Sequence, residues 1–400
     1  ATGDFFTEMN AGGVYCEASA IVTNCSITHN SASTGGGVYG GTLNDCILTD
    51  NDALQWGGGA RDSTLNHCDL MDNFAELQGG GAWGGILNHC TLILNGAFNE
   101  GGGAAFAELN DCALTNNYAD LDGGGVYDSV LNHCTLSGNA AEFGGGSSGG
   151  TLNHCSLTGN TGYNNGGGAA FGTLNNCLLN GNSSFAGGGA RGSTLNNCTV
   201  ANNFAEYRGG GTYQGTLKNC IVYHNDANWE SEDPAADPYA NRFEGSFSFS
   251  CTFPHPGGTG NITVAPQFVG ANDLSLQLGS PCIDTGSNAY TNSLTDLDGF
   301  SRIVDGTVDM GAYEYQSIII ASSPPVLTGL TALGDGAFQF GFTNLAGASF
   351  TVYGTTNLAL PLVDWTNFGP AAETPPGSGQ FQFTDPATNH PQHYYRVLSP

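Results

Sequence analysis

Apolar and polar residues recur with a fixed period from about residue 12 to residue 225. Each unit has a glycine triplet, then Thr-Leu-Asn or a close variant, a cysteine, a leucine two residues after the cysteine, and an asparagine shortly after that. Successive cysteines are 21 or 22 residues apart, and this regularity over ten units predicts a repeat architecture. The cysteines are Cys25, Cys46, Cys68, Cys90, Cys112, Cys134, Cys155, Cys177, Cys198 and Cys220.

Two further columns keep step with these cysteines. A leucine stands three residues before a cysteine in nine units, and an asparagine follows the cysteine in all ten. The leucines are Leu43, Leu65, Leu87, Leu109, Leu131, Leu152, Leu174, Leu195 and Leu217. The asparagines are Asn30, Asn51, Asn73, Asn95, Asn117, Asn139, Asn160, Asn182, Asn203 and Asn225.

The length and composition of the unit exclude most repeat folds. A glycine triplet in every unit is incompatible with helical repeats, and a propeller blade needs about 40 residues. A coil of about 22 residues, built from short strands and tight bends, predicts a β-solenoid. Coils that stack at about 4.8 Å would give a rod roughly 48 Å long for ten coils.

Stacking assigns a structural role to each column. Side chains alternate along a strand, so the cysteine and the leucine two residues later both point into the core. Asparagine in a bend tolerates a left-handed backbone and can hydrogen-bond the asparagines of the coils above and below. Glycine allows a positive φ and a close approach of neighbouring backbones. We therefore expect ladders of identical side chains along the rod.

The chain resembles the pectate-lyase-like superfamily of right-handed parallel β-helices. It is more similar still to a secreted bacterial group with Gly-Gly-Gly and Leu-Asn-Asn-Cys repeats. That group has a closing signature, often called choice-of-anchor Q. It is similar to residues 296–299 (Asp-Leu-Asp-Gly), Arg302 and residues 308–315 (Val-Asp-Met-Gly-Ala-Tyr-Glu-Tyr). Residues 280–286 resemble the segment that precedes this signature. The resemblance implies the fold but little about function, because this superfamily includes lyases, hydrolases, adhesins and structural proteins.

The composition changes along the chain and predicts four regions. Residues 1–225 are the regular repeats, and the acidic, proline-containing residues 226–260 predict a long loop beside the rod. Residues 261–320 are expected to form irregular final coils and a cap. A linker at 321–325 leads to residues 326–400, whose alternation of apolar and polar residues predicts a small antiparallel β-sandwich.

The N-terminus has no segment comparable to this cap, because a coil begins about ten residues into the chain. An exposed β-helix end is an unpaired edge that favours association. We therefore expect another copy to stack head-to-tail, and such a heterologous contact propagates into a filament if it does not close.

Charge narrows the range of partners. Seven Lys and Arg oppose 35 Asp and Glu, for a formal charge of −28, which excludes nucleic acid and disfavours anionic membrane surfaces. No stretch approaches the roughly 18 to 20 apolar residues that span a bilayer.

Carboxylates suit Ca²⁺, and Asp296 and Asp298 could hold one ion near the cap or could equally cap turns through hydrogen bonds. Composition and resemblance together predict an extracellular or cell-surface protein.

Large side chains follow many of the glycine triplets. Such a row could stack on sugar rings or contact a neighbouring subunit, or its rings could simply pack on each other between coils. The aromatic members are Tyr39, Trp83, Phe106, Tyr127, Phe171 and Tyr213, and Arg61 and Arg191 belong to the same series.

Cysteine and histidine suggest further chemistry. Thiols stacked in parallel have poor geometry for a disulfide, so the ladder cysteines are expected to be free and buried, whereas Cys251 and Cys282 lie outside the ladder and are the expected disulfide. Histidines precede four ladder cysteines, but Asp and Asn take the same position elsewhere, which favours a polar bend over a metal site. The histidines are His67, His89, His133 and His154.

These patterns favour a non-catalytic structural or adhesive protein that plausibly self-assembles. An active site normally interrupts a repeat with distinctive insertions, and these coils are regular. Basic residues are also scarce in the rod, where Arg61 and Arg191 are about 29 Å apart. The alternatives are a carbohydrate-binding surface protein and a polysaccharide lyase or hydrolase.

Overall fold

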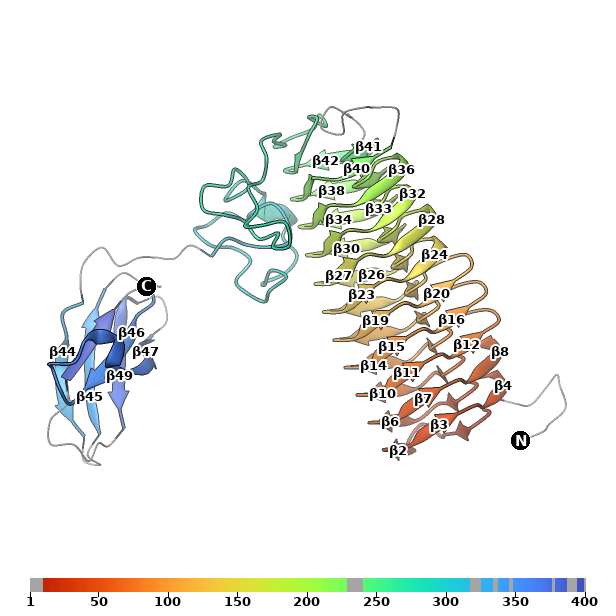
Figure 1. Cartoon of the computed structure of the whole chain (residues 1–400), viewed down its shortest axis with the longest axis horizontal. Coiled ribbons are helices and arrows are strands. Elements are labelled where there is room, and N and C mark those ends of the chain that lie inside the picture. The colour runs from red at the N-terminus through yellow and green to blue at the C-terminus, as the bar shows by residue number, and fades with distance from the viewer. Residues whose placement is uncertain are drawn as a thin grey trace. The chain divides into compact units, whose positions relative to one another are not determined.

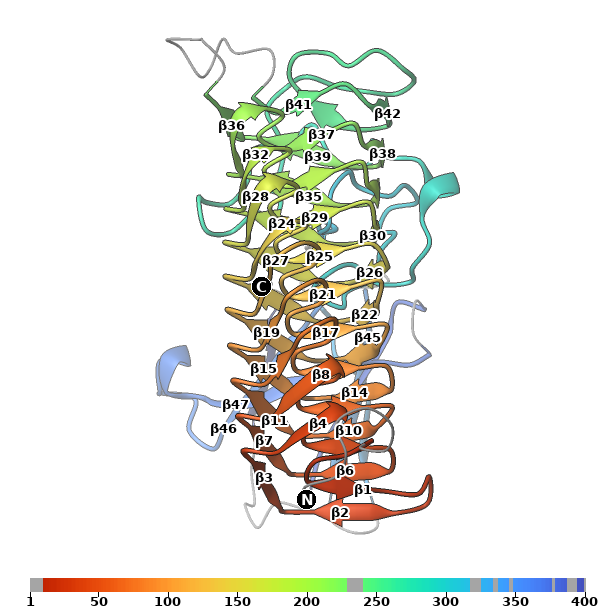
Figure 2. The ribbon, with the colours of Figure 1, turned by 90° about the vertical axis from the view of Figure 1, so that its right-hand side faces the viewer.

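The computed structural model describes residues 10–228, 240–316, 325–333, 337–344, 348–375, 378–386 and 394–398. The chain forms two compact units, Ala1–Tyr315 and Gln316–Pro400. The first unit is a right-handed parallel β-helix, in which each coil adds one strand to each of four parallel sheets (Figures 1 and 2). Three sheets have eleven strands and the fourth has ten, which confirms the predicted β-solenoid.

Sheets A and B carry the first two strands of each coil. Sheet A consists of β1 (Val14–Tyr15), β5 (Val38–Tyr39), β9 (Ala60–Arg61), β13 (Ala82–Trp83), β17 (Ala104–Ala105), β21 (Val126–Tyr127), β25 (Ser147–Ser148), β29 (Ala169–Ala170), β33 (Ala190–Arg191), β37 (Thr212–Tyr213) and β41 (Arg242–Phe243). Sheet B consists of β2 (Ile21–Thr23), β6 (Thr42–Asn44), β10 (Thr64–Asn66), β14 (Ile86–Asn88), β18 (Glu108–Asn110), β22 (Val130–Asn132), β26 (Thr151–Asn153), β30 (Thr173–Asn175), β34 (Thr194–Asn196), β38 (Thr216–Lys218) and β42 (Ser246–Ser248).

Sheets C and D complete each coil. Sheet C consists of β3 (Ser26–Thr28), β7 (Ile47–Thr49), β11 (Asp69–Met71), β15 (Thr91–Ile93), β19 (Ala113–Thr115), β23 (Thr135–Ser137), β27 (Ser156–Thr158), β31 (Leu178–Asn180), β35 (Thr199–Ala201), β39 (Ile221–Tyr223) and β43 (Cys251–Thr252). Sheet D consists of β4 (Ser31–Thr34), β8 (Asp52–Trp56), β12 (Phe74–Ala75), β16 (Gly96–Ala97), β20 (Tyr118–Ala119), β24 (Ala140–Phe143), β28 (Thr161–Asn165), β32 (Ser183–Ala186), β36 (Phe204–Arg208) and β40 (Asp226–Ala227).

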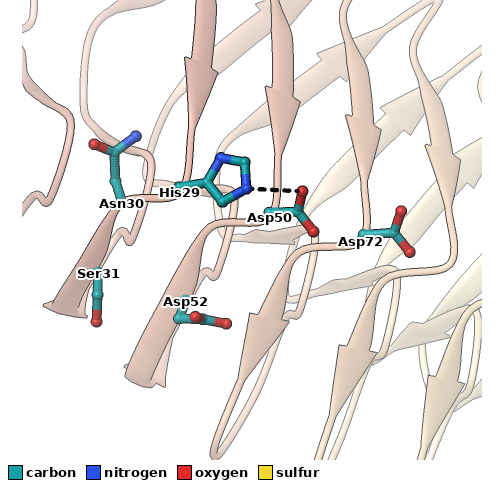
Figure 3. Close-up of a pocket in the computed structure, with 6 residues that line it drawn as sticks. All are labelled: His29, Asn30, Ser31, Asp50, Asp52 and Asp72. Atoms are coloured by element: carbon teal, nitrogen blue, oxygen red, sulfur yellow. Dashed lines mark ion pairs between the residues drawn. The ribbon is translucent and has the colours of Figure 1, made fainter.

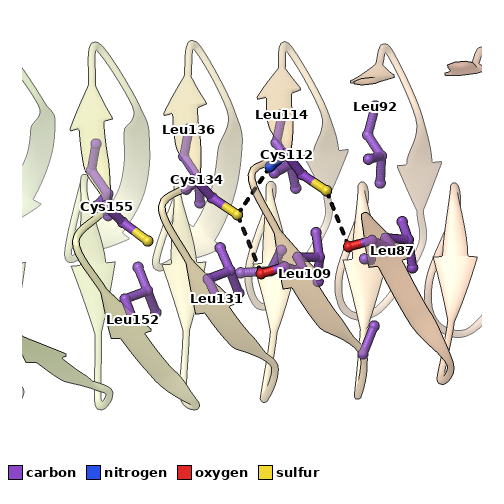
Figure 4. Close-up of a cluster of buried hydrophobic side chains, with 14 of the residues drawn as sticks. Leu87, Leu92, Leu109, Cys112, Leu114, Leu131, Cys134, Leu136, Leu152 and Cys155 are labelled. Carbon is purple, nitrogen blue, oxygen red and sulfur yellow. Dashed lines mark hydrogen bonds between the residues drawn. The ribbon is translucent and has the colours of Figure 1, made fainter. Parts of the chain in front are cut away.

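The interior is a narrow core of stacked identical side chains (Figure 4). Leucines of sheets B and C fill its centre; Leu109 and Leu114 of one coil, for example, are fully buried. Alanine and valine face inward from sheet A, as Ala104 and Val126 do. The cysteines lie at the bend between sheets B and C, where the Cys112 thiol donates to the Leu87 carbonyl at 3.4 Å. Like side chains therefore meet through the rod as the repeat predicts.

A buried asparagine column joins the bends between sheets C and D. The Asn117 side-chain amide donates to the Asn139 Oδ1 at 3.0 Å and to the Leu92 carbonyl at 2.9 Å. Its Oδ1 accepts the Asn95 backbone N–H at 2.9 Å. Each asparagine thus satisfies backbone groups of the bend as well as its neighbour in the column. Buried backbone groups without partners are costly, so this column closes every coil.

The glycine triplet turns the chain between sheets D and A, where the coils are in their closest contact. Gly57 has a φ of 68°, which an L side chain rarely adopts. A Cβ on Gly58 would lie 2.3 Å from the Phe74 carbonyl oxygen and 2.4 Å from that of Gly80. Only glycine lets the backbones of adjacent coils approach this closely.

The end of the rod differs from the predicted loop at 226–260. Strands β41, β42 and β43 lie within that range and form another coil, because residues 242–252 still pair in register with the preceding strands. Most of the acidic residues that suggested the loop fall in 229–239, outside the described residues. Ile262 then pairs with Cys251 and continues the stack for one bridge.

Residues 284–315 do more than add to the end of the rod, where Met310 and Tyr315 share a buried cluster with Cys251. Residues 287–295 run back along the bend between sheets B and C and contact successively earlier coils, and residues 302–312 return toward the end of the rod, where the Gly311 N–H donates to the Asn219 carbonyl at 2.8 Å. The Asn219 amide donates to the Ser287 carbonyl at 2.9 Å, the Asn197 amide to the Tyr290 carbonyl at 3.1 Å, and His154 Nε2 lies 3.1 Å from the Thr295 carbonyl. The segment contains one 3₁₀ turn, η1 (Asn288–Tyr290), and its residues bind the polar bend column instead of adding coils.

The second unit consists of two antiparallel sheets around a phenylalanine-rich core, in agreement with the predicted β-sandwich. Its buried rings include Phe340, Phe350 and Phe381. The predicted linker at 321–325 lies, except for its last residue, outside the described residues. The elements are β44 (Thr328–Ala332), β45 (Phe338–Thr343), β49 (Gln380–Asp385) and β48 (Ala372–Glu373) in one sheet, β47 (Thr366–Pro370), β46 (Thr351–Thr355) and β50 (Tyr394–Leu398) in the other, and the 3₁₀ turn η2 (Leu362–Asp364).

We expect Asn117→Ala to lower the free energy of unfolding by about 3 kcal/mol, because it leaves the buried Asn95 N–H and Leu92 carbonyl without this partner. Urea denaturation followed by circular dichroism measures the change. Asn228→Ala, at an exposed position, is the matched control and should change stability by less than about 0.5 kcal/mol. Equal stability of the two variants would contradict the role of the column.

Candidate functional site

A row of large side chains projects from the outer face of sheet A. Its positions pair in register from coil to coil, so Tyr39, Arg61, Trp83, Ala105 and Tyr127 form one continuous column. The residue before each of these is buried, which turns these five outward. Trp56, at the end of β8, and Phe106, in the bend after β17, complete the surface. We call this surface the aromatic strip and define it as Tyr39, Trp56, Arg61, Trp83, Phe106 and Tyr127.

Arg61 organises the first part of the strip. Its guanidinium carbon lies 5.3 Å from the ring centroid of Tyr39, 4.9 Å from that of Trp56 and 5.0 Å from that of Trp83. Its Nε also forms an ion pair with Asp62 at 3.2 Å. A guanidinium in contact with three rings gains cation–π attraction and fixes their orientation.

Phe106 fills the place that Ala105 leaves empty in the column. It stands in the bend after β17 with a φ of 53°, so its ring lies beside the strand instead of on it. Its centroid is 5.9 Å from that of Trp83 and 5.4 Å from that of Tyr127, both edge-to-face. Phe106 is 42% exposed, while the other rings of the strip are half-buried. The rings therefore pack on each other and still present a surface to solvent.

A row of polar side chains runs beside these rings. The row consists of Gln78, Glu100 and Asp122, and each of them precedes a glycine triplet. Trp56 pairs with Gln78 of the next coil, Gln78 with Glu100, and Glu100 with Asp122. Trp83 Nε1 donates to Gln78 Oε1 at 3.2 Å, and the Gln78 amide donates to Glu100. We call Gln78, Glu100 and Asp122 the polar row.

The polar row affects its surroundings electrostatically. The Ser148 hydroxyl donates to Asp122 at 2.8 Å. Burial raises the pKa of Tyr127, and the negative charges of Glu100, Asp122 and Asp128 raise it further. The Tyr127 hydroxyl is therefore a neutral hydrogen-bonding group throughout the physiological pH range. Together the strip and the row offer apolar ring surfaces flanked by amide, carboxylate and hydroxyl groups.

The six predicted aromatic residues fall into two groups. Ser148 and Ala170 occupy the column between Tyr127 and Arg191, so the rings are interrupted there. Beyond the gap, Arg191 lies 5.6 Å from the Phe171 centroid and 5.5 Å from that of Tyr213. Tyr213 stacks on Phe243 with centroids 5.3 Å apart.

The four histidines lie in the bend between sheets B and C, at φ angles of 51° to 53°, as do the Asp and Asn residues of the same column. His67 stacks on His89 and His133 on His154, each with centroids 5.0 Å apart. No metal-binding group of three or more His, Cys, Asp or Glu occurs in the part of the chain that the structure describes. All four histidines therefore occupy the same left-handed bend position as the Asp and Asn residues of their column.

A shallow pocket of about 280 Å³ lies near the first coils (Figure 3). His29, Asp50 and Asp72 stand at equivalent positions of adjoining coils, and His29 Nε2 is 3.5 Å from Asp50. Asp52 also borders the pocket, and burial followed by the charge of Asp50 raises its pKa. The pocket is an acidic depression on the flank of the rod and has no aromatic lining.

The ladder cysteines are free thiols, and all are buried except Cys25. Each backbone N–H approaches the sulfur of the next coil, as between Cys112 and Cys134 at 3.4 Å (Figure 4). Burial raises the pKa of Cys155 well above its ordinary value. The Cys155 thiol is therefore a protonated, poorly nucleophilic member of the core.

The predicted disulfide between Cys251 and Cys282 is absent, and both residues are free thiols. They nevertheless share one buried cluster at the end of the rod. The Cys251 thiol donates to the Val264 carbonyl at 3.2 Å, and its hydrogen bond with Cys282, together with burial, raises the pKa of Cys282.

Asp296, one of the two residues proposed for calcium, is 1% exposed and acts within the protein. Its Oδ1 accepts the N–H groups of Asp298 at 3.1 Å and Phe300 at 2.8 Å, and its Oδ2 accepts that of Glu314 at 3.0 Å. Asp296 therefore caps turns through hydrogen bonds, which is one of the two roles considered for it. Asp298 is partly exposed, and burial raises its pKa.

A buried charge cluster lies beneath the same segment. Arg302 is fully buried, its Nη1 is 3.8 Å from Glu314, and its Nη2 donates to the Asp309 carbonyl at 3.1 Å. Glu314 accepts the N–H groups of Val304 and Asp309, each at 3.0 Å. Burial raises the pKa of Asp309 to about 6 and that of Glu314 to about 7. The charged residues of 296–315 therefore fold this segment against the rod.

Sequence reasoning did not find Trp56 or the polar row. They stand where strands of sheet D end irregularly, and the register shifts between Ala32 and Thr34 opposite this position. Strand periodicity consequently fails there. The signal that could have found them is their place immediately before the glycine triplet.

Comparison with known proteins finds solved structures of low similarity. No family model matches the chain, and no curated protein matches it. A solved pectate lyase, Pel9A, is 13% identical, covers 73% of this chain and 70% of its own length, and has a TM-score of 0.30. A mutant tailspike of E. coli bacteriophage HK620 in complex with a pentasaccharide is 12% identical, covers 95% and 74%, and has a TM-score of 0.24.

The buried carboxyl groups predict a pH dependence of stability. Glu314 has an ordinary pKa of 4.5 and a folded pKa of about 7, so the folded state binds more protons between these values. The free energy of unfolding should therefore decrease as pH rises from about 4.5 to 7, by up to about 3 kcal/mol for this group, and level off above. Glu314→Gln should flatten this part of the profile.

Thermal unfolding midpoints of wild type and Glu314→Gln, recorded from pH 4.5 to 8, measure this effect. Glu206→Gln, at an exposed position of sheet D, is the matched control for the loss of one negative charge. Equal slopes for the wild type, Glu314→Gln and Glu206→Gln would contradict the raised pKa of Glu314.

Proposed function

We propose that this protein is a non-catalytic, extracellular adhesive β-helix that binds polysaccharide through the aromatic strip. The observation that carries the proposal is the continuous set of partly exposed rings from Tyr39 to Tyr127, flanked along its length by the polar row. Sugar rings have apolar faces and hydroxyl edges, and aromatic faces beside hydrogen-bonding groups complement both.

The strip is rigid before any ligand arrives. Each ring contacts another ring or Arg61, and Trp83 is also fixed by its hydrogen bond to Gln78. Side chains that are already ordered lose little conformational entropy on binding. A regular rod of this kind presents the same surface over several coils, which suits adhesion to a chain molecule.

The carboxylates of the polar row raise the alternative of a hydrolase. Glu100 and Asp122 lie in adjacent coils beside the rings, which is the type of placement that glycoside hydrolysis uses. Each carboxylate, however, accepts a hydrogen bond from a neighbour, Gln78 or Ser148, and the repeat continues through these coils without an insertion. We therefore favour binding without cleavage.

Self-assembly is a separate part of the proposal. In the described residues, β1, β2, β3 and β4 each pair with another strand on one side only. A second copy that pairs with these edges would extend the rod head-to-tail, and a contact of this kind grows into a filament. Negative-stain electron microscopy of native protein tests this point, and a uniform population of single rods would contradict it.

Affinity electrophoresis in gels that contain purified neutral and acidic polysaccharides tests the binding function. The wild type should be retarded by at least one of them, and Trp83→Ala should weaken binding by about tenfold or more. Tyr163→Ala removes a ring that is 63% exposed on sheet D and should leave binding unchanged. No retardation by any polysaccharide would refute adhesion, and release of reducing ends or unsaturated products would identify an enzyme.

A further inference from the structure

The surface around Arg191 repeats the arrangement at Arg61, six coils further along sheet A. The guanidinium carbon of Arg191 lies 5.6 Å from the ring centroid of Phe171, in the bend of the preceding coil, and 5.5 Å from that of Tyr213 in the following strand of the sheet. Phe171 is 54% exposed, whereas Arg191 and Tyr213 are half-buried. We call Phe171, Arg191 and Tyr213 the arginine site.

The two arginines differ in their ion partner. Arg61 Nε pairs at 3.2 Å with Asp62, the residue that follows it, whereas Gly192 follows Arg191. Among the residues that the structure describes, no carboxylate lies within ion-pair distance of the Arg191 guanidinium, and its buried Nε has no hydrogen-bond partner. The positive charge of Arg191 is therefore not neutralised within this part of the chain.

The columns beside the arginine site carry neutral or basic side chains in the adjoining coils. In register with the polar row, these coils place Asn165, Ala186 and Arg208 at the end of sheet D. In the bend after sheet A, Gly192 is followed one coil later by Gln214, which has a similar left-handed backbone. Neutral groups and one arginine therefore stand here in place of the carboxylates that border the aromatic strip.

Arg208 extends the positive surface. Its guanidinium carbon is 4.4 Å from the ring centroid of Phe243, and Phe243 stacks on Tyr213 with centroids 5.3 Å apart. Two guanidinium groups thus lie against one pair of stacked rings. The chain has seven Lys and Arg in all, and four of them occur between residues 191 and 242, namely Arg191, Arg208, Lys218 and Arg242. This end of the rod therefore concentrates the few positive charges of an acidic protein.

We propose that the arginine site binds an anionic group, a carboxylate or a sulfate ester, carried by a sugar of a polysaccharide. The inference rests on the proposed function and adds to the aromatic strip a second subsite of opposite charge. A guanidinium group can donate two parallel N–H bonds to either anion, and such charge-assisted bonds are stronger than bonds between neutral groups. The exposed ring of Phe171 lies beside the guanidinium, so a sugar that carries the anion can stack on it.

The net charge of the protein, −28, does not prevent anion binding at this position. Screening limits the reach of exposed charges to about 8 Å at physiological ionic strength. Along the bend column, the carboxylates nearest to Gly192 are those of Glu244 and Asp128, at distances of about 9.6 Å and about 14 Å for two and three coils. Glu244 is also engaged by the Gln214 amide, which donates to it at 2.6 Å. An anion at Arg191 is therefore attracted by the guanidinium more strongly than it is repelled by these carboxylates.

The first experiment measures binding to three immobilised dextrans that share one glucose backbone: unmodified dextran, carboxymethyl dextran and dextran sulfate. Biolayer interferometry with the full chain should show binding to at least one charged dextran, and this binding should weaken as sodium chloride rises from about 50 mM to about 500 mM. Binding to carboxymethyl dextran alone identifies the carboxylate as the ligand group, and binding to dextran sulfate alone identifies the sulfate ester. Equal binding of unmodified dextran would overturn the inference.

Arg191→Gln should weaken binding to charged dextran by about tenfold or more, because it removes the cation that the anion contacts. Arg396→Gln, at an exposed position of the second unit, is the matched control for the loss of one positive charge and should leave binding unchanged. The same affinity in the wild type and in both variants would show that the anion binds elsewhere, and would overturn the inference.

A second pair of variants gives Arg191 the ion partner that Arg61 has. Gly192→Asp puts a carboxylate at the position equivalent to Asp62, and Gly192→Asn puts a neutral side chain of the same shape there. Gly192 has a φ of 59° and Asp62 one of 50°, a conformation that Asp and Asn both tolerate. A Cβ on Gly192 would lie 2.9 Å from Cδ1 of the exposed Phe171 ring, so this ring must move equally in both variants.

Gly192→Asp should weaken binding to charged dextran by about tenfold, since the new carboxylate competes with the ligand for the guanidinium, and Gly192→Asn should retain most of the binding. Circular dichroism and thermal unfolding verify that both variants fold, and Arg191→Gln provides the same test if one does not. Equal affinity of the Asp and Asn variants would contradict the role of Arg191.

Failure of this inference can be told from failure of the proposed function. If the wild type binds neither charged dextran, the arginine site is refuted, and the proposed function still stands where a neutral polysaccharide is bound and Trp83→Ala weakens that binding. Absence of binding to every polysaccharide would refute the proposed function itself.

Discussion

In-register stacking of identical coils is the constraint on which the rest of this structure depends. A coil of about 22 residues cannot bury its own core or satisfy the backbone groups of its bends. The next coil supplies both, because each leucine meets a leucine and each buried asparagine completes the hydrogen bonds of the one before it, as Asn117 does for Asn95. A slip of one residue along a strand would turn the leucines outward and break the asparagine column at once.

This constraint leaves the outer positions of the coils free to vary. In sheet A the inward residues remain small, Val38, Ala60 and Ala82, while their outward neighbours are Tyr39, Arg61 and Trp83. Side chains that bind a ligand can therefore occupy the outward positions without disturbing the packing of the core. The rigid spacing of the coils also sets the distances between those outer side chains.

Residues 284–315 show the same rod used as a platform. Their hydrogen bonds reach the polar bend column at Asn219, Asn197 and His154, and their own charges, with Arg302 at the centre, are buried against it. Arg302 is strongly desolvated, and it is held by its ion pair with Glu314 and by the hydrogen bonds of its Nη2 to the Asp309 and Gly311 carbonyls. The segment thus covers part of one corner and leaves the aromatic strip, between sheets D and A, on a different part of the coil.

Much of the fold could be predicted from periodicity alone. The columns of Cys112, Leu109 and Asn117 indicated strands, bends and inward faces, because side chains alternate along a strand and identical coils must place them alike. The candidate site could be predicted only in part. Tyr39, Trp83 and Tyr127 follow the triplets in the regular part of the unit, whereas Glu100 and its neighbours lie at an irregular strand end where periodicity carries no information.

The sequence by itself determined the coil, its core ladders and the outward row of aromatic residues, since these follow from short-range alternation repeated many times. Tertiary structure decided the rest. It placed Cys251 and Cys282 in one buried cluster, ran residues 287–295 back along the rod, and placed the polar row beside the rings. These features depend on contacts between residues far apart in the chain, and no local pattern records which of the available surfaces such a segment will cover.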